Sequence, residues 1–447
     1  MTTTRQDEEP LVVMETLRIG LLGLGTVGGG AARLLLEQPD RIARRAGRPL
    51  RLAAVAVRDR AKPRTIDIGR VPLTNDAFGV VADREIDVIV ETIGGTTVAR
   101  ELVLAALAAG KHVVTANKAL LAEHGPEIFA RAQAAGRAVA FEASVGGGVP
   151  IVQALGVALA ANQIQSLAAI LNGTCNFILT RMTGEGLRYA DALSEAQRLG
   201  YAESDPTLDV DGTDTAHKLA ILVQLAFETN IRPSLIARQG IDRLELADLT
   251  YAGELGYAVK LLALARLTAS GLDLRVAPTL VKRGEPLAEV RGPYNAIRVV
   301  GDAVGDTLFQ GRGAGAMPTA SAVVADLIDV ATGRAQATSR VARLWADSQP
   351  AHDFAPANTI KSRYYLRFTI ADQPGVLGRI AQILGDSGIS IASVIQHDSG
   401  DDAPESSPVP LVIMTHHAIQ ADLESAIAII DRLDVVHAPT VRMGVED

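Results

Sequence analysis

The length and composition of the chain indicate a multidomain globular protein. Its 447 residues are 48% hydrophobic and 21% charged, which suggests about two to four domains with large cores. A net charge of −8 and only 4% aromatic residues argue against a nucleic-acid partner, and no apolar run is long enough to span a membrane. The single cysteine and an acidic N-terminal stretch without a signal-peptide core lead us to expect a cytoplasmic protein.

Residues 1–16 are predicted to be a disordered tail, and residues 17–150 a doubly wound domain. Short strands such as RIGLLG, EIDVIVE and KHVVTA alternate with helical stretches such as TTVARELVLAALAAG. Strands that alternate with helices form βαβ units around a parallel sheet. The predicted fold class of this part is therefore α/β, of the Rossmann type.

A glycine-rich loop follows the first predicted strand and begins the first predicted helix. The loop, Gly23-Leu24-Gly25-Thr26-Val27-Gly28, has the pattern G-x-G-x-x-G. In this context the glycines let backbone amides at a helix N-terminus approach a pyrophosphate, so the loop predicts a dinucleotide site. The second strand ends in VAVRDR, where Arg58 suits the 2′-phosphate of NADP while Asp59 leaves NAD open.

Residues 151–318 are predicted to form an α+β domain in which long helices dominate. The expected helices include SEAQRLG, DTAHKLAILVQLAF and ELGYAVKLLALARL, and the expected strands are LRVAPTLVKR and YNAIRVVGD. The glycine-rich stretch GRGAGAMPTASAVVADLIDVA then begins a helix. We expect this helix, over 319–345, to return to the first domain.

The stretch DVDGTDTAHKLAILVQL places an acid and an amine on an otherwise apolar helix face. Asp214 and Lys218 share this face with Ile221, Leu222 and Leu225. One explanation is a surface ion pair, because the two charges are four residues apart. The other is a cleft in which a desolvated lysine moves protons. The sequence of this stretch alone leaves both open.

Residues 346–362 are predicted to be a linker, and residues 363–447 a separate regulatory domain. The pattern of the last domain is strand, helix, two strands, helix and strand, carried by YYLRFTI, GVLGRIAQILGDSG, SIASVIQH, VPLVIMTH, ADLESAIAIIDRLD and VVHAPTVRM. This βαββαβ order is ferredoxin-like. The polar insert SGDDAPESSP is predicted to be a mobile loop.

Six motifs in residues 17–345 resemble those of homoserine dehydrogenase. They are GLGTVG, ANKALLA, FEASVGGGVPI, LNGTCNFILT, LGYAESDPTLDVDGTDTAHKLAIL and GRGAGAMPTASAVVAD. The last domain, with ADQPGVLGRIAQILGDSGISI, resembles an ACT domain. The resemblance implies a reversible NAD(P)-dependent interconversion of L-homoserine and L-aspartate 4-semialdehyde, in the biosynthesis of threonine, methionine and isoleucine.

The resemblance also implies roles for individual residues. Lys218 corresponds to the usual proton donor, and Lys118 would contact substrate and cofactor. Lys118 directly follows a strand in TANK, where doubly wound folds bind ligands, and the sequence does not decide which lysine moves the proton. Glu203 and Asp214 would pair with the ammonium group of homoserine. The implied cofactor contacts are Gly23, Gly25, Thr26, Val27, Gly28, Arg58, Thr92, Lys118 and Gly315.

The same resemblance implies a bound cation, a bound effector and a homo-oligomer. A monovalent cation, Na⁺ or K⁺, would bind the Glu142 carboxylate and backbone carbonyls, at Val145, Gly147 and Val149. An effector, expected to be L-threonine acting as a feedback inhibitor, would bind the first turn of the ACT domain, at Asp372, Gly375, Val376 and Leu377. A homo-oligomer, either a dimer or a tetramer, is expected.

Two other functions are alternatives to that of a homoserine dehydrogenase. Cys175 in NGTCNF would be the nucleophile of an aldehyde-oxidising enzyme, although a lone thiol in an apolar segment is more often buried and inert. A catalytically inactive amino-acid sensor would bind NADP without turnover. The presence of Lys118, Glu203, Asp214 and Lys218 argues against the sensor.

Overall fold

The computed structural model describes residues 15–342, 351–397 and 408–446, and it divides the chain into two compact units. The first unit comprises residues 1–147 and 315–346, and the second comprises residues 148–314 and 347–447. Most of the predicted tail, the start of the predicted linker and all but the last residue of the insert SGDDAPESSP lie outside the described residues. None of the described helices is long and apolar enough to cross a membrane.

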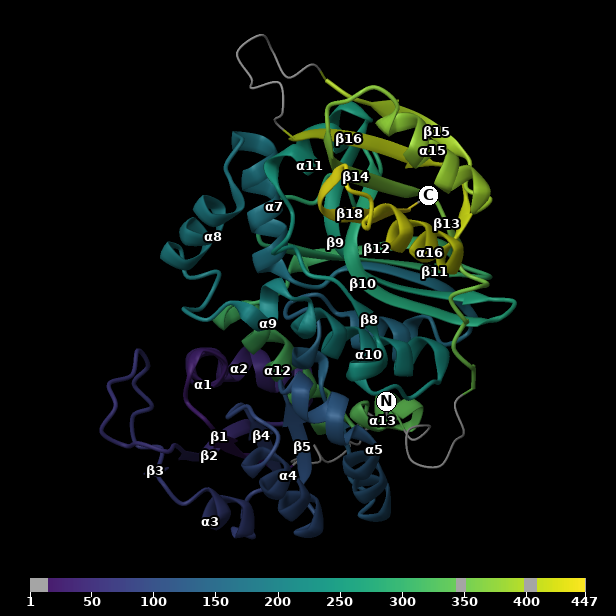
Figure 1. Ribbon diagram of the computed structural model, residues 1–447. Coiled ribbons are helices and arrows are strands. Elements are labelled where there is room, and N and C mark those ends of the chain that lie inside the picture. Colours follow the sequence, from purple (N-terminus) through teal and green to yellow (C-terminus); the bar gives the residue numbers. More distant parts are fainter. Residues whose placement is uncertain (1–14, 343–350, 398–407, 447) are drawn as a thin grey trace, which may run out of the picture. The chain divides into compact units, whose positions relative to one another are not determined.

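The first unit is built on a six-stranded parallel sheet with the order β3-β2-β1-β4-β5-β6 (Figure 1). This is the doubly wound order, which confirms the α/β fold class predicted from the sequence. Helices α1, α2 and α12 pack on one face of the sheet, and α3, α4 and α5 pack on the other. The elements are β1 (Leu17–Leu22), α1 (Thr26–Glu37), α2 (Pro39–Ala46), β2 (Leu50–Ala56), β3 (Leu73–Thr74), α3 (Ala77–Ala82), β4 (Val88–Glu91), α4 (Val98–Ala108), β5 (His112–Thr115), α5 (Lys118–Ala134), β6 (Val139–Ala140), the 3₁₀ turn η1 (Glu142–Ser144), α12 (Ala316–Thr332) and α13 (Ala335–Ala342).

Strand β1 is apolar on both faces because helices cover both sides of the sheet. Ile19 and Leu21 point into the core shared with α1 and α12. Gly20 faces the other side, where a Cβ atom would lie 2.8 Å from Val80 of α3. Continuous apolar strands are typical of parallel sheets buried on both faces, and the glycine lets α3 approach the strand closely.

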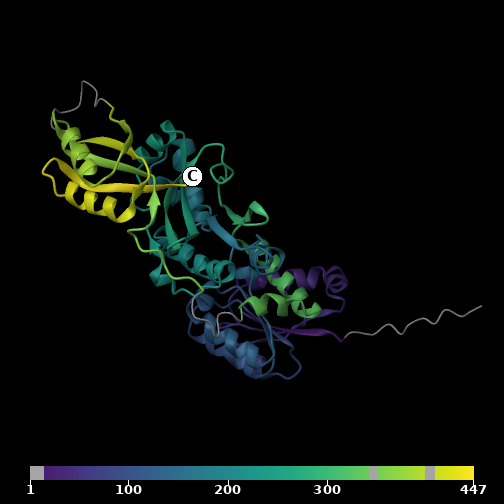
Figure 2. The same ribbon diagram turned by 90° about the vertical axis from the view of Figure 1, so that its right-hand side faces the viewer.

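The second unit contains one mixed sheet that runs through both its parts. Its main path is β12-β11-β7-β9-β10-β18-β14-β16-β15, and β8 pairs with β10. In Figures 1 and 2 the yellow C-terminal strands continue the teal strands of the same sheet, because β18 pairs in parallel with β10. The elements before residue 315 are α6 (Ile151–Gln153), the π-helical turn η2 (Ala154–Ala158), β7 (Ile164–Ile170), α7 (Gly173–Glu185), α8 (Tyr189–Arg198), α9 (Thr207–Val210), α10 (Thr213–Phe227), the 3₁₀ turn η3 (Pro233–Leu235), β8 (Ala237–Arg238), α11 (Leu246–Glu254), β9 (Tyr257–Thr268), β10 (Gly271–Lys282), β11 (Tyr294–Gly301) and β12 (Gly305–Arg312).

The helix expected for ELGYAVKLLALARL is wrong, because most of this stretch forms strand β9 between β7 and β10. Its leucines and alanines favour a helix when considered alone. In the sheet, however, every residue from Val259 to Ala265 is buried. A central strand covered on both faces is a continuous apolar run, which periodicity does not distinguish from a buried helix. The strand pairing therefore overrides the local helix propensity.

The C-terminal part of the second unit has the predicted βαββαβ order. Its strands lie in the order β18-β14-β16-β15, and α15 and α16 contribute to a core of its own. It is tied to α11 by a buried ion pair in which Arg367 Nε donates to Asp248 Oδ1 at 2.6 Å. The elements are β13 (Lys361–Ser362), β14 (Tyr364–Ala371), α15 (Val376–Asp386), β15 (Ile391–Ile395), β16 (Pro408–Thr415), β17 (Ala418–Ile419), α16 (Gln420–Ile430) and β18 (Val436–Glu446).

Candidate active site

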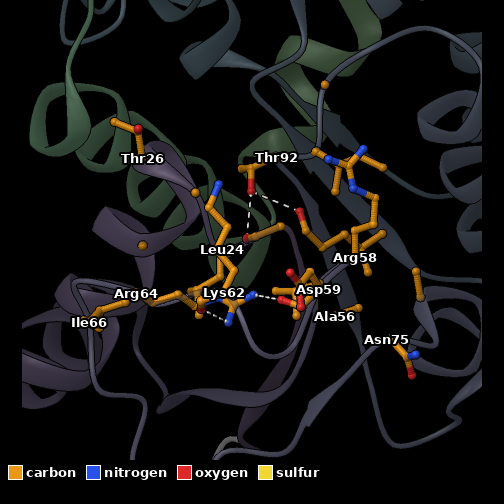
Figure 3. A pocket seen from close by; sticks show the side chains of 18 of the residues that line it. Leu24, Thr26, Ala56, Arg58, Asp59, Lys62, Arg64, Ile66, Asn75 and Thr92 are labelled. Atoms are coloured by element: carbon orange, nitrogen blue, oxygen red, sulfur yellow. Dashed lines mark hydrogen bonds between the residues drawn. The ribbon is translucent and has the colours of Figure 1, made fainter. Parts of the chain in front are cut away.

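A cavity of about 1140 Å³ opens in the first unit beyond the carboxyl ends of β1, β2 and β4 (Figure 3). The strand order reverses between β1 and β4, which is where doubly wound sheets bind ligands. The glycine-rich loop from Gly23 to Thr26 forms one wall, and Thr92 and Ile93, which follow β4, form another. The volume is large enough for a dinucleotide.

Glycine is required at different positions of the loop for different structural reasons. A Cβ atom on Gly28 would lie 2.1 Å from the carbonyl oxygen of Gly23, so only glycine lets α1 start this close to the loop. A Cβ atom on Gly25 would meet nothing within 4 Å and would project into open space. The hydroxyl oxygen of Thr92 lies 3.0 and 3.1 Å from the carbonyl oxygens of Leu22 and Gly23, which holds the loop in place. The exposed backbone at Gly25 and the helix N-terminus beyond it fit a pyrophosphate.

The segment after β2 gives the cavity a basic wall. Arg58, Lys62 and Arg64 all line it (Figure 3). Arg64 is positioned by hydrogen bonds to the carbonyl oxygens of the same turn, one of them to Lys62 at 2.8 Å. Asp59 also lines the cavity, but its Oδ1 atom accepts a hydrogen bond from the backbone of Ala61 at 2.8 Å. This segment therefore presents three cationic side chains and one carboxylate, and the carboxylate is hydrogen-bonded within its own turn. Such a wall fits a phosphate group in addition to the pyrophosphate.

The predicted cofactor residues divide into two sets. Those that line the cavity are Gly23, Gly25, Thr26, Arg58 and Thr92. Those that do not line it are Val27, Gly28, Lys118 and Gly315, although Gly315 caps α12, whose Ala316 and Met317 do line it. Lys118 is half-buried at the start of α5, after an Asn117 cap that accepts from the Leu120 amide. The sequence analysis missed Arg64, although its charge and its place after β2 were available as signals.

Helix α10 in the second unit carries Asp214 and Lys218 one turn apart. The Lys218 Nζ atom donates to Asp214 Oδ2 at 2.7 Å and to the carbonyl oxygen of Leu171 at 2.8 Å. The side chains of Lys218 and Asp214 are only 12% and 10% exposed. The pair is therefore largely buried, which excludes the explanation of a surface ion pair.

Asn172 joins this pair to a second carboxylate. Its Nδ2 atom donates to Asp214 Oδ2 at 3.0 Å and to Asp209 Oδ1 at 2.8 Å. Its Oδ1 atom accepts from the backbone of Cys175 and so caps α7. Asn295 donates to the same Leu171 carbonyl oxygen that Lys218 uses, at 3.1 Å. We name Leu171, Asn172, Asp209, Asp214, Lys218 and Asn295 the α10 cluster.

Sequence reasoning found two members of the α10 cluster and missed the others. Asp209, Asn172 and Asn295 are not among the site residues predicted from the sequence. The available signal for Asn172 was its position in LNGTCNFILT, directly after the strand β7. The cluster can polarise a bound group and move a proton, because it contains an ammonium ion held between a carboxylate and a carbonyl oxygen.

The structure argues against Cys175 as a nucleophile. The residue is fully buried, and its thiol donates to the Asp209 carbonyl oxygen at 3.2 Å. Burial, together with Asp209 and Asp214, raises the pKa of Cys175 well above its usual value. The thiol therefore stays protonated near neutral pH, and a thiolate attack on an aldehyde is disfavoured.

The remaining predicted site residues lie in several places. Glu203 is exposed, and its backbone carbonyl oxygen accepts from Gln197 at 3.1 Å. Glu142 is buried in η1, where its amide donates to Asp326 Oδ2 at 3.0 Å. Val145 is also buried, and Gly147 has a φ of 56°. Val149 is buried within the second unit. In the described part of the chain, no group of three or more His, Cys, Asp or Glu side chains could hold a metal ion.

The predicted effector turn joins β14 to α15. Gly375 caps α15 with a φ of 90°, a left-handed conformation that favours glycine. Asp372 Oδ1 lies 3.3 Å from Gln396 Nε2, Val376 is buried and Leu377 is exposed. The turn thus presents one carboxylate and one apolar side chain at the surface of this part of the unit.

Comparisons with known proteins agree with these features. Family models match residues 150–328 as homoserine dehydrogenase, 23–142 as its NAD-binding domain and 364–435 as an ACT domain. A homoserine dehydrogenase of Pseudomonas aeruginosa is 48% identical over 97% of this chain and 99% of its own length. One of Corynebacterium glutamicum is 43% identical over 94% of this chain and 93% of its own.

Solved structures are also similar, over nearly the whole chain in one case and over about 70% of it in another. The crystal structure of a homoserine dehydrogenase from Thiobacillus denitrificans has a TM-score of 0.89 and 46% identity, and the match covers 97% of this chain and 99% of that one. A hyperthermophilic archaeal homoserine dehydrogenase in complex with NADPH has a TM-score of 0.59 and 26% identity, over 71% of this chain and 98% of that one. These similarities extend over both units.

Proposed function

The chain belongs to the homoserine dehydrogenase family, and we propose on that premise that it interconverts L-homoserine and L-aspartate 4-semialdehyde with NADP as its preferred coenzyme. The single observation that carries the proposal is the buried pair of Asp214 and Lys218 within the α10 cluster. An acid and an amine on the buried face of a helix are costly unless they are paired or functional. Their presence fits a site that binds a charged substrate and moves a proton.

Each residue of the pair has a role in this proposal. The coenzyme supplies the acceptor for the hydride that leaves the hydroxyl-bearing carbon. Lys218, when neutral, takes the hydroxyl proton at its Nζ atom and returns it in the reverse reaction. The Leu171 carbonyl oxygen and Asp214 hold Nζ in position, at 2.8 and 2.7 Å. Asp214 and Glu203 provide carboxylates for the ammonium group of the substrate, and Lys118 contacts substrate and coenzyme.

The basic wall of the first unit supports the choice of NADP. Arg58, Lys62 and Arg64 line the coenzyme cavity, whereas Asp59 is engaged with its own turn. An NAD site usually has a free acid here for the ribose hydroxyl groups. Guanidinium and ammonium groups would instead bind the 2′-phosphate, which favours NADP over NAD.

A monovalent cation and an effector complete the proposal. The buried Glu142 carboxylate, with carbonyl oxygens of Val145, Gly147 and Val149, would bind Na⁺ or K⁺ through oxygen ligands. L-threonine would bind the ACT turn at residues 372–377 and inhibit the enzyme, which would work as a dimer or tetramer in the cytoplasm. The reaction would then serve threonine, methionine and isoleucine biosynthesis.

The test is an assay of purified protein with L-homoserine and NADP⁺, in buffer with potassium, that follows NADPH absorbance. We expect reduction that depends on homoserine and that is faster with NADP⁺ than with NAD⁺. L-Serine, which is one carbon shorter, is the control substrate and should give little reduction. Tight NADPH binding without turnover of homoserine would contradict the proposal and favour the sensor.

A further inference from the structure

A second cavity, of about 290 Å³, lies within the second unit where its two parts meet. One side is formed by β8 and β10, and the other by β14, β18 and α16. Strands β10, β18 and β14 are neighbours in the sheet, and β8 pairs with β10. The effector turn at residues 372–377 does not line it. Its volume is just below the range of most ligand sites, which is about 300–1,000 Å³, so the cavity suits a metabolite much smaller than a nucleotide.

The cavity has an excess of positive charge. Arg238, Arg275 and Arg442 line it, together with the buried carboxylate of Asp273. Asp273 lies 3.9 Å from Arg275, which is a loose ion pair. Arg442 is paired with Glu424 at 2.9 Å. Three guanidinium groups beside two carboxylates leave one net positive charge, which an anionic ligand would neutralise.

A buried hydroxyl group in the same place lacks a partner. Tyr364 lines the cavity and is only 3% exposed. Within the part of the chain that the structure describes, its hydroxyl oxygen has no hydrogen-bond partner. Burial raises the pKa of Tyr364, and the nearby Arg275 and Arg442 oppose this, so the hydroxyl stays neutral among these charges. An unpaired buried hydroxyl costs free energy that a bound acceptor would recover.

The wall of the cavity continues into the α10 cluster. The Gln239 amide donates to the Val276 carbonyl oxygen at 2.8 Å, and the Ile241 amide donates to that of Val210 at 2.9 Å. A Cβ atom on Gly212, the residue that caps α10, would lie 3.1 Å from Val276. Gln239 and Val276 both line the cavity. A ligand that orders this wall would therefore also restrict the segment from α9, which carries Asp209, to the start of α10, which carries Asp214.

We propose that this cavity binds a small α-amino acid with a second carboxylate, and that it is an effector site separate from the turn at residues 372–377. The carboxylates would meet Arg238, Arg275 and Arg442, the ammonium group would meet Asp273, and Tyr364 would donate to a carboxylate oxygen. Such a ligand carries one net negative charge, which would neutralise the one net positive charge of the cavity. The proposal does not depend on turnover of homoserine.

Isothermal titration of the full chain with L-aspartate tests this. We expect saturable binding to the wild-type protein, and weaker binding of succinate, which lacks the ammonium group. Arg275→Gln should lower the affinity for L-aspartate by about tenfold or more, since a charge-assisted hydrogen bond is lost. Arg432→Gln is the matched control, because Arg432 is exposed in the same part of the unit and does not line the cavity.

Tyr364→Phe keeps the shape of the cavity and removes only the hydroxyl group, so it remains informative if Arg275→Gln fails to fold. It should weaken L-aspartate binding by about three- to tenfold. Amide hydrogen exchange should slow at residues 209–212 and 237–241 when L-aspartate binds. Absence of saturable binding, an equal loss in Arg432→Gln, or protection confined to residues 372–377 would overturn the proposal.

Discussion

The coenzyme cavity of the first unit and the α10 cluster of the second are built by different means. The cavity depends on backbone shape, since Gly25 leaves its wall open and Gly28 lets α1 approach the loop. The cluster depends on side chains from four separate segments, joined by hydrogen bonds to Asn172, Asp214 and Lys218. Coenzyme binding in the cavity should therefore be lost when a larger side chain is introduced. Catalysis by the α10 cluster should be lost when a charge or a hydrogen bond is removed.

After loss of Lys218 itself, the largest effect is expected for Asp214→Asn, which leaves Lys218 without its carboxylate. The Lys218 Nζ atom then loses a group that holds it in position, so kcat/KM for homoserine should fall about 10²- to 10³-fold, which is about 3–4 kcal/mol of transition-state stabilisation. Steady-state kinetics would measure this. Asp209→Asn is the control, because Asp209 shares Asn172 with Asp214 and no hydrogen bond joins it to Lys218 among those described. Equal losses in both variants would show that the cluster is only structural.

Two glycine variants separate shape from packing in the coenzyme cavity. Gly28→Ala places a methyl group 2.1 Å from a carbonyl oxygen, so it should lower both thermal stability and NADPH affinity. Gly25→Ala adds a methyl group in open space, so it should keep the stability and reduce NADPH affinity by about tenfold or more. Thermal denaturation and NADPH fluorescence titration measure the two quantities. A wild-type affinity in Gly25→Ala would contradict the assigned position of the pyrophosphate.

Arg58→Ser should change the choice of coenzyme. Loss of a hydrogen bond to a charged group costs about 1.5–3 kcal/mol, so KM for NADP⁺ should rise about 10- to 100-fold while that for NAD⁺ stays unchanged. Arg51→Ser is the control, because this exposed arginine lies in β2, the strand that precedes Arg58, and does not line the cavity. A parallel rise for both coenzymes would indicate that Arg58 does not contact the 2′-phosphate.

The smallest effect on activity is expected at Lys260, which contrasts with Lys218 in the same unit. Lys260 is buried on β9, where its Nζ atom donates to Asn176 and Val290, and burial lowers its pKa to about 8. Between about pH 8 and its ordinary value of 10.5, the unfolded chain binds more protons at this site, so this residue makes stability rise with pH. Urea denaturation should show that Lys260→Met loses this rise. A pH dependence identical to that of wild type would contradict the assignment.

The sequence predicts elements whose signals are local. The glycine-rich loop and the alternation of strands and helices are local, so the doubly wound fold and the βαββαβ order are confirmed. Strand β9 was mistaken for a helix because its burial on both faces comes from strands distant in sequence. Asp214 and Lys218 were identified from helical periodicity. Asn172 was missed because its hydrogen bonds reach residues 37 and 42 positions further along the chain.

The most direct test of the central claim compares Lys218→Met with Lys118→Met in homoserine oxidation at saturating substrates, with NADPH binding measured in parallel. The account predicts that Lys218→Met binds NADPH as the wild type does and loses nearly all turnover. It predicts that Lys118→Met mainly raises KM for homoserine and NADP⁺. Wild-type kcat in Lys218→Met, with kcat lost in Lys118→Met, would place the proton transfer at Lys118 and contradict the role assigned to the α10 cluster.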